Sequence, residues 1–584
     1  MASRFVFFFL VLGIAAQFAA AQSNPLAAVA DTAARAASIP ADDVRGMLNE
    51  VRTLIRSQAE QLESQRKQIE RQQIEIEELR RDVASARRDG GSITEQELEA
   101  ASTVALLNSG ASSLKATSSV ETATLPAIRS AVVAMKRAQQ SAGNDSGDAP
   151  LSIRFGRGSL TPGGWVDFTA YYRSTDVGSG LGTNFASIPF DDTVQGGLSE
   201  ARFTAQSSRI SVRADENFGA TRVFGYAEAD FNGYFPPNGY VSTNSDTMRL
   251  RVYFTDLSRG RWELLGGQSW SLLTPNRAGV SPFLSEIYNT MHLDTNYQVG
   301  LTFARQAQLR AVYHISNYIA LGLSAENPQQ FSGNAVTFPA LFDAAQTDLG
   351  SSTGAGGGTA TPTLHPDFIA KLSADAGWGD RNWHFEAAGL LTPIAILTPA
   401  SVTKTGSAKD FHEGSGISVA ANLEVVKGLH VILAGFWSDG GGRYIGGLGP
   451  AFVVAQPGSS TSPFVARLVH SGSGIAAAEW QASKSTVLSL TYSGAYFGRA
   501  ISTDPSTGSF VGYGFAGSAN SNNRSLQEGT FASLTTLWRH PSYGSVQMIT
   551  QSSYVTRAPW YVAPKSAGTA HVFEGYANLR YVLP

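Results

Sequence analysis

Apolar and polar residues alternate along many short segments of the chain beyond residue 160. In residues 248–255, every second side chain from Met248 to Phe254 is apolar, and the positions between them begin with Arg249 and Arg251. Successive side chains of a β-strand point to opposite faces, so this pattern predicts a strand with one apolar and one cationic face. Strands of this kind, joined by long connections on one side only, are typical of a transmembrane β-barrel.

The same alternation predicts sixteen strands. They cover residues 163–173, 198–213, 220–231, 247–257, 261–270, 297–315, 318–326, 367–377, 382–392, 411–426, 428–438, 463–480, 485–498, 524–540, 543–556 and 570–583. Long and short connections alternate between them, as expected when one rim of a barrel faces the outside and the other faces the periplasm. Residues 297–315 also admit a turn at Gln306–Gln308, which would divide that strand in two.

The N-terminus carries an export signal. Arg4 precedes an apolar run from Phe5 to Ala16, and Ala19-Ala20-Ala21 provides a cleavage pattern. Residues 1–21 are therefore predicted to be a secretory signal peptide. A membrane anchor is the alternative, although the run is shorter than the ~20 residues that a spanning helix needs. Later segments are too polar to span as helices, so membrane insertion is expected to use strands.

A heptad repeat occupies residues 42–88. Its core positions hold aliphatic residues alternating with glutamines, and the central ones are Ile55, Gln58, Leu62, Gln65, Ile69, Gln72 and Ile76. These are the a and d positions of a coiled coil, where polar residues select the oligomeric state. Three symmetry-related glutamines can hydrogen-bond around an axis, so the pattern favours a parallel homotrimer. A single charged helix without a partner is the alternative.

Short helices and a linker are predicted between the coiled coil and the strands. Gly90-Gly91 ends the heptad helix, and Thr94 with Glu97 forms a capping box that begins a shorter helix. Residues 141–150 are rich in Gly, Ser and Asp, which is typical of a flexible linker.

The pattern thus predicts an all-β membrane protein: a 16-stranded antiparallel transmembrane β-barrel preceded by an α-helical coiled coil. Its expected parts are a signal peptide (1–21), a periplasmic coiled coil (42–88), short helices with a linker (89–150) and the barrel (151–584).

Composition narrows the possible functions. The chain has no Cys, 16% charged residues and a formal net charge of -3. Without Cys it has neither disulfides nor thiolate metal sites. The small net charge and the lack of a basic cluster among aromatic residues argue against nucleic acid as a partner.

Arginines on the inward faces are the candidate functional residues. Ile210 and Val212 are expected to face lipid, and the same alternation directs a set of arginines into the lumen: Arg209, Arg213, Arg222, Arg249, Arg251 and Arg310. Guanidinium groups stay charged and bind carboxylates in a bidentate manner, so they would favour anions. Glu228, Asp230 and Glu263 are expected on the same faces and could instead neutralise the arginines as a structural network.

The connection 271–296 is the candidate constriction. It carries Arg277, Glu286 and Tyr288. Folded inward, it would narrow a lumen that sixteen strands leave wide enough for an aqueous channel. An external or intersubunit loop is the alternative.

Three features resemble the DcaP-like family of trimeric outer-membrane porins. They are the coiled coil before the barrel, the stretch Gly266-Gly267-Gln268-Ser269-Trp270 before the long loop, and the stretch Ala325-Glu326-Asn327-Pro328 at the end of a strand. The resemblance implies a homotrimer of sixteen-stranded barrels that passes small anionic solutes, dicarboxylates among them.

The sequence therefore predicts a bacterial outer-membrane porin whose partners are membrane lipid and small anionic solutes. An enzyme is not expected, because His314 and Ser316 form no recognisable catalytic arrangement. No metal or cofactor motif is present. An alternative is an envelope-tethering protein whose coiled coil contacts the cell wall, with transport secondary.

Overall fold

The computed structural model describes residues 151–155, 158–233, 246–283, 291–333, 335–350, 361–564 and 566–584. The chain divides into two compact units, Met1–Lys115 and Ala116–Pro584, and all described residues belong to the second. The predicted signal peptide, coiled coil, short helices and linker lie outside the described residues.

One antiparallel sheet closes on itself to form a barrel, because β2 pairs with β22 on one edge and with β3 and β4 on the other. β3 and β4 share one position in the wall, and β1 (Ile153–Phe155) is a short addition beside β2. The described part of the chain thus forms sixteen wall positions, as predicted. They are β2 (Gly158–Arg173), β3 (Glu200–Thr204) with β4 (Arg209–Phe218), β5 (Thr221–Asp230), β6 (Arg249–Arg259), β7 (Trp262–Trp270), β8 (Arg305–His314), β9 (Ile319–Glu326), β10 (Asp367–Trp378), β11 (Arg381–Thr398), β12 (Ala408–Val426), β13 (Leu429–Asp439), β16 (His470–Gln481), β17 (Thr486–Phe497), β20 (Asn523–His540), β21 (Gly544–Pro559) and β22 (Ala570–Val582).

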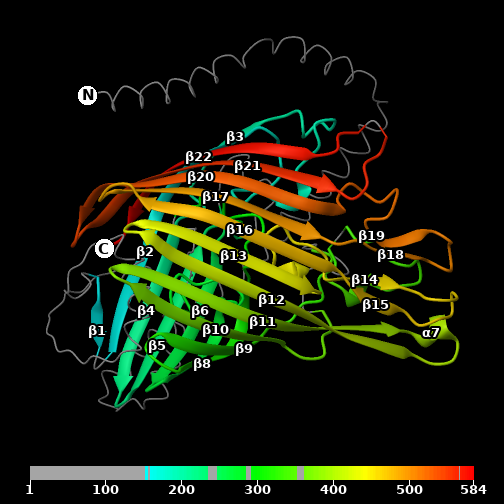
Figure 1. The fold of residues 1–584 in the computed structure, drawn as a ribbon, viewed down its shortest axis with the longest axis horizontal. Helices are drawn as coiled ribbons and strands as arrows, with labels where there is room; N and C mark the ends of the chain where they lie inside the picture. The colour runs from blue at the N-terminus through cyan, green and yellow to red at the C-terminus, as the bar shows by residue number, and fades with distance from the viewer. Residues whose placement is uncertain are drawn as a thin grey trace, which may run out of the picture. The chain divides into compact units, whose positions relative to one another are not determined.

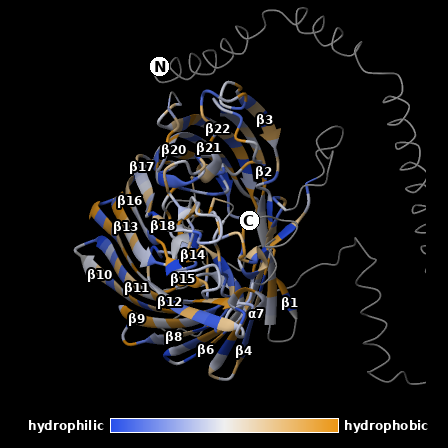
Figure 2. Ribbon diagram, turned by 90° about the vertical axis from the view of Figure 1, so that its right-hand side faces the viewer, coloured by the Kyte–Doolittle hydropathy of each residue, from blue (hydrophilic) through white to orange (hydrophobic). Residues whose placement is uncertain are grey.

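Short turns gather at one rim and long connections at the other, which confirms the predicted alternation (Figure 1). The long connections carry small elements of their own: η1 (Phe185–Ser187), η2 (Ala344–Gln346), α7 (Ala400–Thr403), η3 (Gly442–Tyr444), β14 (Phe452–Ala455), β15 (Val465–Leu468), β18 (Ala500–Thr503) and β19 (Phe510–Tyr513). Seen from the long-connection end, ribbons of these connections lie inside the ring of strands (Figure 2). Their apolar side chains, such as Phe452, Val454 and Phe464, pack into a buried cluster.

The predicted strands 198–213 and 463–480 are each divided, the first into β3 and β4 and the second into β15 and β16. Two further details of the predicted strands are wrong. The first concerns residues 297–315, where the strand begins only at Arg305, and Gln306–Gln308 continue it rather than turning. Tyr297 and Gly300 have positive φ angles of 61° and 76°, which break an extended run. Val299 is 0% exposed and Leu301 6%, because these side chains pack inside the barrel rather than against lipid.

The second error concerns β6. The register with β5 shifts between Glu228 and Ala229, so one extra residue of β6 sits in a β-bulge. A one-residue shift exchanges the two faces of a strand. Beyond Arg251, therefore, Val252 and Phe254 point inward and are 3% and 5% exposed, whereas Tyr253 is 41% exposed.

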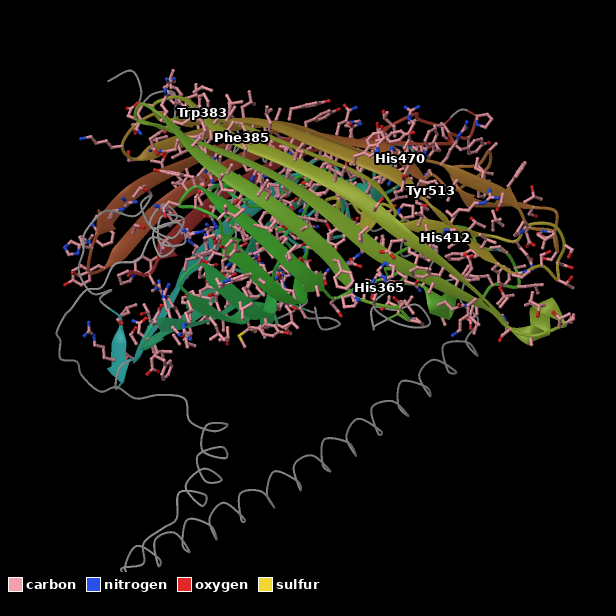
Figure 3. The ribbon with its side chains drawn as sticks, turned by 60° about the horizontal axis from the view of Figure 1, so that its bottom comes forward. His365, Trp383, Phe385, His412, His470 and Tyr513 are labelled. Atoms are coloured by element: carbon pink, nitrogen blue, oxygen red, sulfur yellow. The ribbon has the colours of Figure 1, made fainter. Side chains whose placement is uncertain are left out.

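Outward positions of the wall are mostly large and apolar. Leu323, Ile417 and Leu490 are each more than half exposed, at 52%, 65% and 62%. Figure 3 shows Phe385 and Trp383 towards the short-turn end of the wall, and His365, His412 and His470 towards the other end. An apolar outer band bordered by aromatic residues is the surface that a barrel presents to a bilayer.

Candidate functional site

The connection between β7 and β8, residues 271–304, enters the lumen. Its first limb follows the inner faces of β9, β10 and β11, where carboxylates accept backbone N–H bonds. The Leu272 amide donates to Glu326 at 2.9 Å, the Asn276 amide to Glu386 at 3.1 Å, and the Gly279 amide to Asp375 at 3.0 Å. Acceptors on three successive strands thus fix the limb along the wall.

Two cations strengthen this attachment. The ammonium group of Lys371 is buried and donates to the Thr274 carbonyl at 2.8 Å and to Glu386 at 3.1 Å. Arg277, a predicted site residue, donates through both terminal nitrogens to Glu479 of β16, at 2.8 and 2.6 Å. A bidentate pair fixes orientation as well as position, so Arg277 ties the loop to a second part of the wall.

Phe283 ends the described part of the first limb in an aromatic pocket on β5 and β6. Its ring lies 5.2 Å from Phe224, 5.2 Å from Tyr226 and 5.8 Å from Phe254, in edge-to-face arrangements. Such contacts add to the energy of burial. Residues 284–290, which include Glu286 and Tyr288, lie outside the described residues.

The return limb, residues 291–304, contacts other parts of the wall. The Leu293 amide donates to Gln551 of β21 at 2.6 Å, and the Val299 amide to Glu528 of β20 at 2.8 Å. The Gln298 side chain donates to Ser493 of β17 at 2.9 Å. One loop therefore reaches inner faces from β5 to β21, and an external position for its described limbs is excluded.

Arg249 and Arg251 point inward from β6 and share the Asp230 carboxylate. Arg251 donates to Glu228 at 2.9 Å, to Asp230 at 2.5 Å and to the Tyr297 hydroxyl at 3.0 Å. Arg249 binds Asp230 in a bidentate manner, at 3.0 and 2.8 Å. The neutralising network that the sequence allowed is thus formed at these positions.

Two further arginines belong to this group. Arg209 lies 3.4 Å from Glu228. Arg305 lies over the Trp270 ring, 5.6 Å from its centroid. The charges of Arg249 and Arg251 act on the Arg305 guanidinium at this position. We call Arg209, Arg249, Arg251 and Arg305, with Glu228 and Asp230, the cationic cluster. Four guanidinium groups face two carboxylates, so the cluster keeps a positive surplus.

The other predicted arginines lie elsewhere on the inner wall. Arg213 and Arg222 share the Asp215 carboxylate and both lie over the Phe224 ring. Arg310 is 4% exposed, and its charge interacts with those of Glu263 and Asp256. The structure therefore brings three of the predicted arginines into one cluster and leaves Arg213, Arg222 and Arg310 apart from it.

Exposure separates the arginines that a solute can touch from those that it cannot. The side chain of Arg249 is 32% exposed, that of Arg213 27% and that of Arg277 26%. The side chain of Arg251 is only 3% exposed. Arg249 and Arg251 are two residues apart in the same strand, but only Arg249 presents its charge to water.

A second group of charges surrounds the return limb on β2, β3, β20 and β22. We call Asp294, Glu200, Glu528 and Glu574, with Arg173, the acidic cluster. Arg173 is fully buried and lies 2.8 Å from Glu200 and 3.4 Å from Glu574. Asp294, in the loop, accepts from the Thr183 and Asn296 amides at 3.0 and 2.7 Å, and burial raises the pKa of its carboxyl. Acids outnumber cations here.

The sequence pattern missed several of these residues. In a single strand 297–315, alternation puts Arg305 on the same face as Tyr297 and Phe303, so the pattern does not direct it inward with the other arginines. Arg173 and Lys371 lie at inward positions of their strands, but alternation alone does not show that they contact the loop or the acidic cluster. Their partners, Glu200 and Asn276, are far along the chain. Only the folded loop brings them together.

Among the described residues, no group of three His, Asp or Glu side chains is placed to hold a metal ion. None of the helices in that part of the chain is long and apolar enough to cross a membrane.

Neither a protein-family model nor a curated protein sequence matches the chain. Among solved structures, the outer membrane channel DcaP of Acinetobacter baumannii is similar, with a TM-score of 0.50 and 14% identity over 73% of this chain and 97% of the other. The anion-selective porin from Comamonas acidovorans matches at a TM-score of 0.41 and 9% identity, over 73% of this chain and all (100%) of the other. OmpT of Vibrio cholerae matches at a TM-score of 0.38 and 10% identity, over 74% of this chain and 99% of the other. The similarity to DcaP shows the fold alone, and the two lower scores add no argument.

Proposed function

We propose that the chain is an outer-membrane porin, a water-filled channel through which small hydrophilic solutes diffuse. The observation that carries this proposal is the loop 271–304, whose limbs are fixed to inner faces of the wall from β5 to β21. A loop held inside a sixteen-stranded barrel narrows the lumen and gives it a defined lining. The apolar outer band places the barrel in a bilayer.

The channel favours anions, small carboxylates among them. The support is the surplus of the cationic cluster beside the loop, together with the exposure of Arg249. Arg251, which is buried in ion pairs, holds the cluster in place, whereas Arg249 presents its charge to passing solutes. A unit charge about 8 Å from an ion in water contributes roughly 0.5 kcal/mol, which corresponds to a two- to threefold preference.

The test is electrical. Purified protein in planar bilayers should show single-channel conductance, and its reversal potential in a salt gradient should indicate anion preference. Arg249→Gln combined with Arg305→Gln should lower the anion-to-cation permeability ratio by roughly fivefold, because two such charges are removed. The flux of small carboxylates should fall more than that of neutral sugars of similar size.

Arg259→Gln is the matched control. Arg259 ends the same strand as Arg249 at the short-turn rim and is exposed, so its loss removes the same charge far from the loop. An unchanged reversal potential in the double variant would reject the anion proposal. Absence of conductance in the wild-type protein would reject the channel itself.

Assembly is part of the proposal. The heptad repeat of residues 42–88 supports a homotrimer with parallel periplasmic helices, and light scattering in detergent tests it. Tethering to the cell wall would act through the same helices. Deletion of residues 42–140 separates the two roles, because a tether is lost while conductance of the barrel persists.

A further inference from the structure

Two hairpins of the long connections enclose a cavity at the rim opposite the short turns. One hairpin is β14–β15, between β13 and β16, and the other is β18–β19, between β17 and β20. β14 contacts both strands of the second hairpin, and the two hairpins lie side by side at the long-connection end (Figures 1 and 2). The cavity has a volume of about 430 Å³, and small-ligand sites usually measure about 300–1,000 Å³. Its lining includes Gln456, Pro457, Arg467, Ser502, Thr503 and Pro505.

Gln456 brings an unpartnered hydrogen-bond acceptor to this lining. The residue is 2% exposed, and its Nε2 donates to the Ser460 and Ser462 carbonyls at 3.0 and 2.9 Å. Because a carbonyl can only accept, these two bonds fix which end of the side-chain amide is nitrogen. The other end, Oε1, is buried and accepts no hydrogen bond from the described part of the chain. A buried acceptor without a donor is unfavourable, so Oε1 is suited to a ligand that supplies an O–H group.

Ser502 and Arg467 add a hydroxyl group and a positive charge. The Ser502 Oγ is buried and, like Gln456 Oε1, has no partner among the described residues. Arg467 is exposed, and within the part of the chain that the structure describes its guanidinium group forms no ion pair. The preceding residue of β15, Ala466, packs into a buried apolar cluster with Phe464. Arg467 therefore lies on the opposite face of β15, which lines the cavity.

The nearby carboxylates are occupied by backbone donors. Asp504 is 1% exposed and accepts from the Ala340 and Ser506 amides, both at 2.9 Å. Asp410 accepts from the Ala466 amide at 2.8 Å. Neither carboxylate lines the cavity. The cavity therefore keeps the positive charge of its guanidinium group.

Both hairpins are fixed to other parts of the molecule, so the cavity is preformed. The Phe464 amide, next to β15, donates to the Thr398 hydroxyl of β11 at 2.8 Å. In the second hairpin, Gly512 of β19 exchanges two backbone hydrogen bonds with Thr337, at 3.0 and 2.7 Å. A preformed site loses less conformational entropy when a ligand binds.

We propose that this cavity binds a small hydroxylated carboxylate, such as a sugar acid, at the entrance of the lumen. The guanidinium group of Arg467 can bind the carboxylate in a bidentate manner. Gln456 Oε1 and Ser502 Oγ can pair with hydroxyl groups of the same molecule, and Pro457 and Pro505 supply apolar edges. The inference rests on the proposed channel only for the later passage of the solute, because binding is measurable without conductance.

Calorimetric titration of the purified full chain in detergent tests the binding, with gluconate as the probe. Glucose lacks the carboxylate, and propionate lacks the hydroxyl groups. Gluconate should bind more tightly than either, because only gluconate offers both kinds of partner. Absence of gluconate binding would overturn the proposal, as would equal affinity for gluconate and either of the other two compounds.

Substitutions locate the binding. Arg467→Gln should weaken gluconate binding by roughly tenfold, which corresponds to about 1.4 kcal/mol, and Ser502→Ala by about threefold. Arg499→Gln is the matched control, because Arg499 is exposed at the same rim, lies over the Trp560 ring at 5.4 Å and does not line the cavity. It should leave the affinity unchanged. Equal affinity in Arg467→Gln and Arg499→Gln would overturn the proposal.

The lumen variant separates this site from the selectivity of the channel. Arg249→Gln combined with Arg305→Gln removes two charges of the cationic cluster and leaves the cavity intact, so gluconate should still bind with the wild-type affinity. Loss of binding in this variant would place the site in the lumen and overturn the proposal. The reversal potential of the same variant tests channel selectivity, so the two proposals fail independently.

A protection measurement needs no change in Arg467 or Ser502. The chain contains no Cys, so Thr503→Cys places a single thiol in the lining and Ser509→Cys places one on the same hairpin outside it. Gluconate should slow the reaction of a neutral thiol reagent at position 503 and leave the reaction at position 509 unchanged. Equal rates with and without gluconate at position 503 would overturn the proposal.

Discussion

The cationic and acidic clusters both flank the return limb of the inner loop, yet they balance charge in opposite ways. In the cationic cluster, Arg209, Arg249, Arg251 and Arg305 face two carboxylates, and water reaches part of Arg249. In the acidic cluster, Arg173 is the cation among four carboxylates, and its side chain is 0% exposed. The Tyr297 hydroxyl touches the first cluster, while the Asp294 carboxylate belongs to the second.

This difference in charge balance indicates that the two clusters have different roles, one lining the channel and the other supporting the loop. A surplus of charge is tolerated where solvent screens it, and there it acts on passing ions. Buried carboxylates need their neighbours' donors, and their removal from water costs several kcal/mol per ion. The cationic cluster is therefore suited to selecting solutes, and the acidic cluster to holding the loop between β2, β20 and β22.

The largest expected effect is the loss of Arg173. Arg173→Met leaves Glu574 buried without the cation that pairs with it and leaves Glu200 with only the exposed Arg202. Breaking a buried pair in this way costs about 3–5 kcal/mol. The free energy of unfolding in lipid vesicles, from denaturant titration, measures the loss. Arg202→Met is the control, because Arg202 also contacts Glu200, at 3.4 Å, but its side chain is 49% exposed. It should cost about 1 kcal/mol or less, and equal losses in the two variants would contradict the buried role of Arg173.

A smaller loss of stability is expected when Arg251 is replaced. Arg251→Met removes bonds to Glu228 and Asp230, but Arg209 and Arg249 still compensate both carboxylates. The free energy of unfolding should fall by about 1–3 kcal/mol. Arg249→Met, at a partly exposed position, should cost about 1 kcal/mol or less while changing ion selectivity more than Arg251→Met does. If Arg251→Met proved as costly as Arg173→Met, the idea of a cationic surplus would fail.

The smallest effect is a pH dependence at Asp294. Because burial raises the pKa of this carboxyl, the folded state binds its proton more tightly than the unfolded state does. The stability that depends on protonated Asp294 is fully present below the pKa of the unfolded chain and is lost as pH rises through the raised value.

Asp294→Asn removes this dependence. The variant should therefore be less stable relative to wild type at pH 4 than at pH 8, as measured by thermal unfolding at both values. Asp191→Asn serves as a control, since Asp191 is an exposed carboxylate in a connection at the same rim. A difference between variant and wild type that does not change with pH would show that the Asp294 carboxyl titrates alike in both states.

Alternation in the sequence determined the wall. Each strand places successive side chains on opposite faces, and a wall between lipid and lumen needs an apolar face and a polar face. The local pattern was therefore enough to predict the sixteen strand positions and the two rims. The same rule directed Arg209, Arg249 and Arg251 inward.

Only the tertiary structure decided what the inward residues do. The bulge at Glu228 reversed the faces of β6 beyond Arg251, and the positive φ angles at Tyr297 and Gly300 turned an alternating segment into the return limb of the loop. Whether an arginine is buried in ion pairs or open to solutes depends on partners that lie far away in sequence, as Lys371 and Asn276 or Arg277 and Glu479 do. Local pattern carries no information on such pairs, because they form only when the loop folds into the closed barrel.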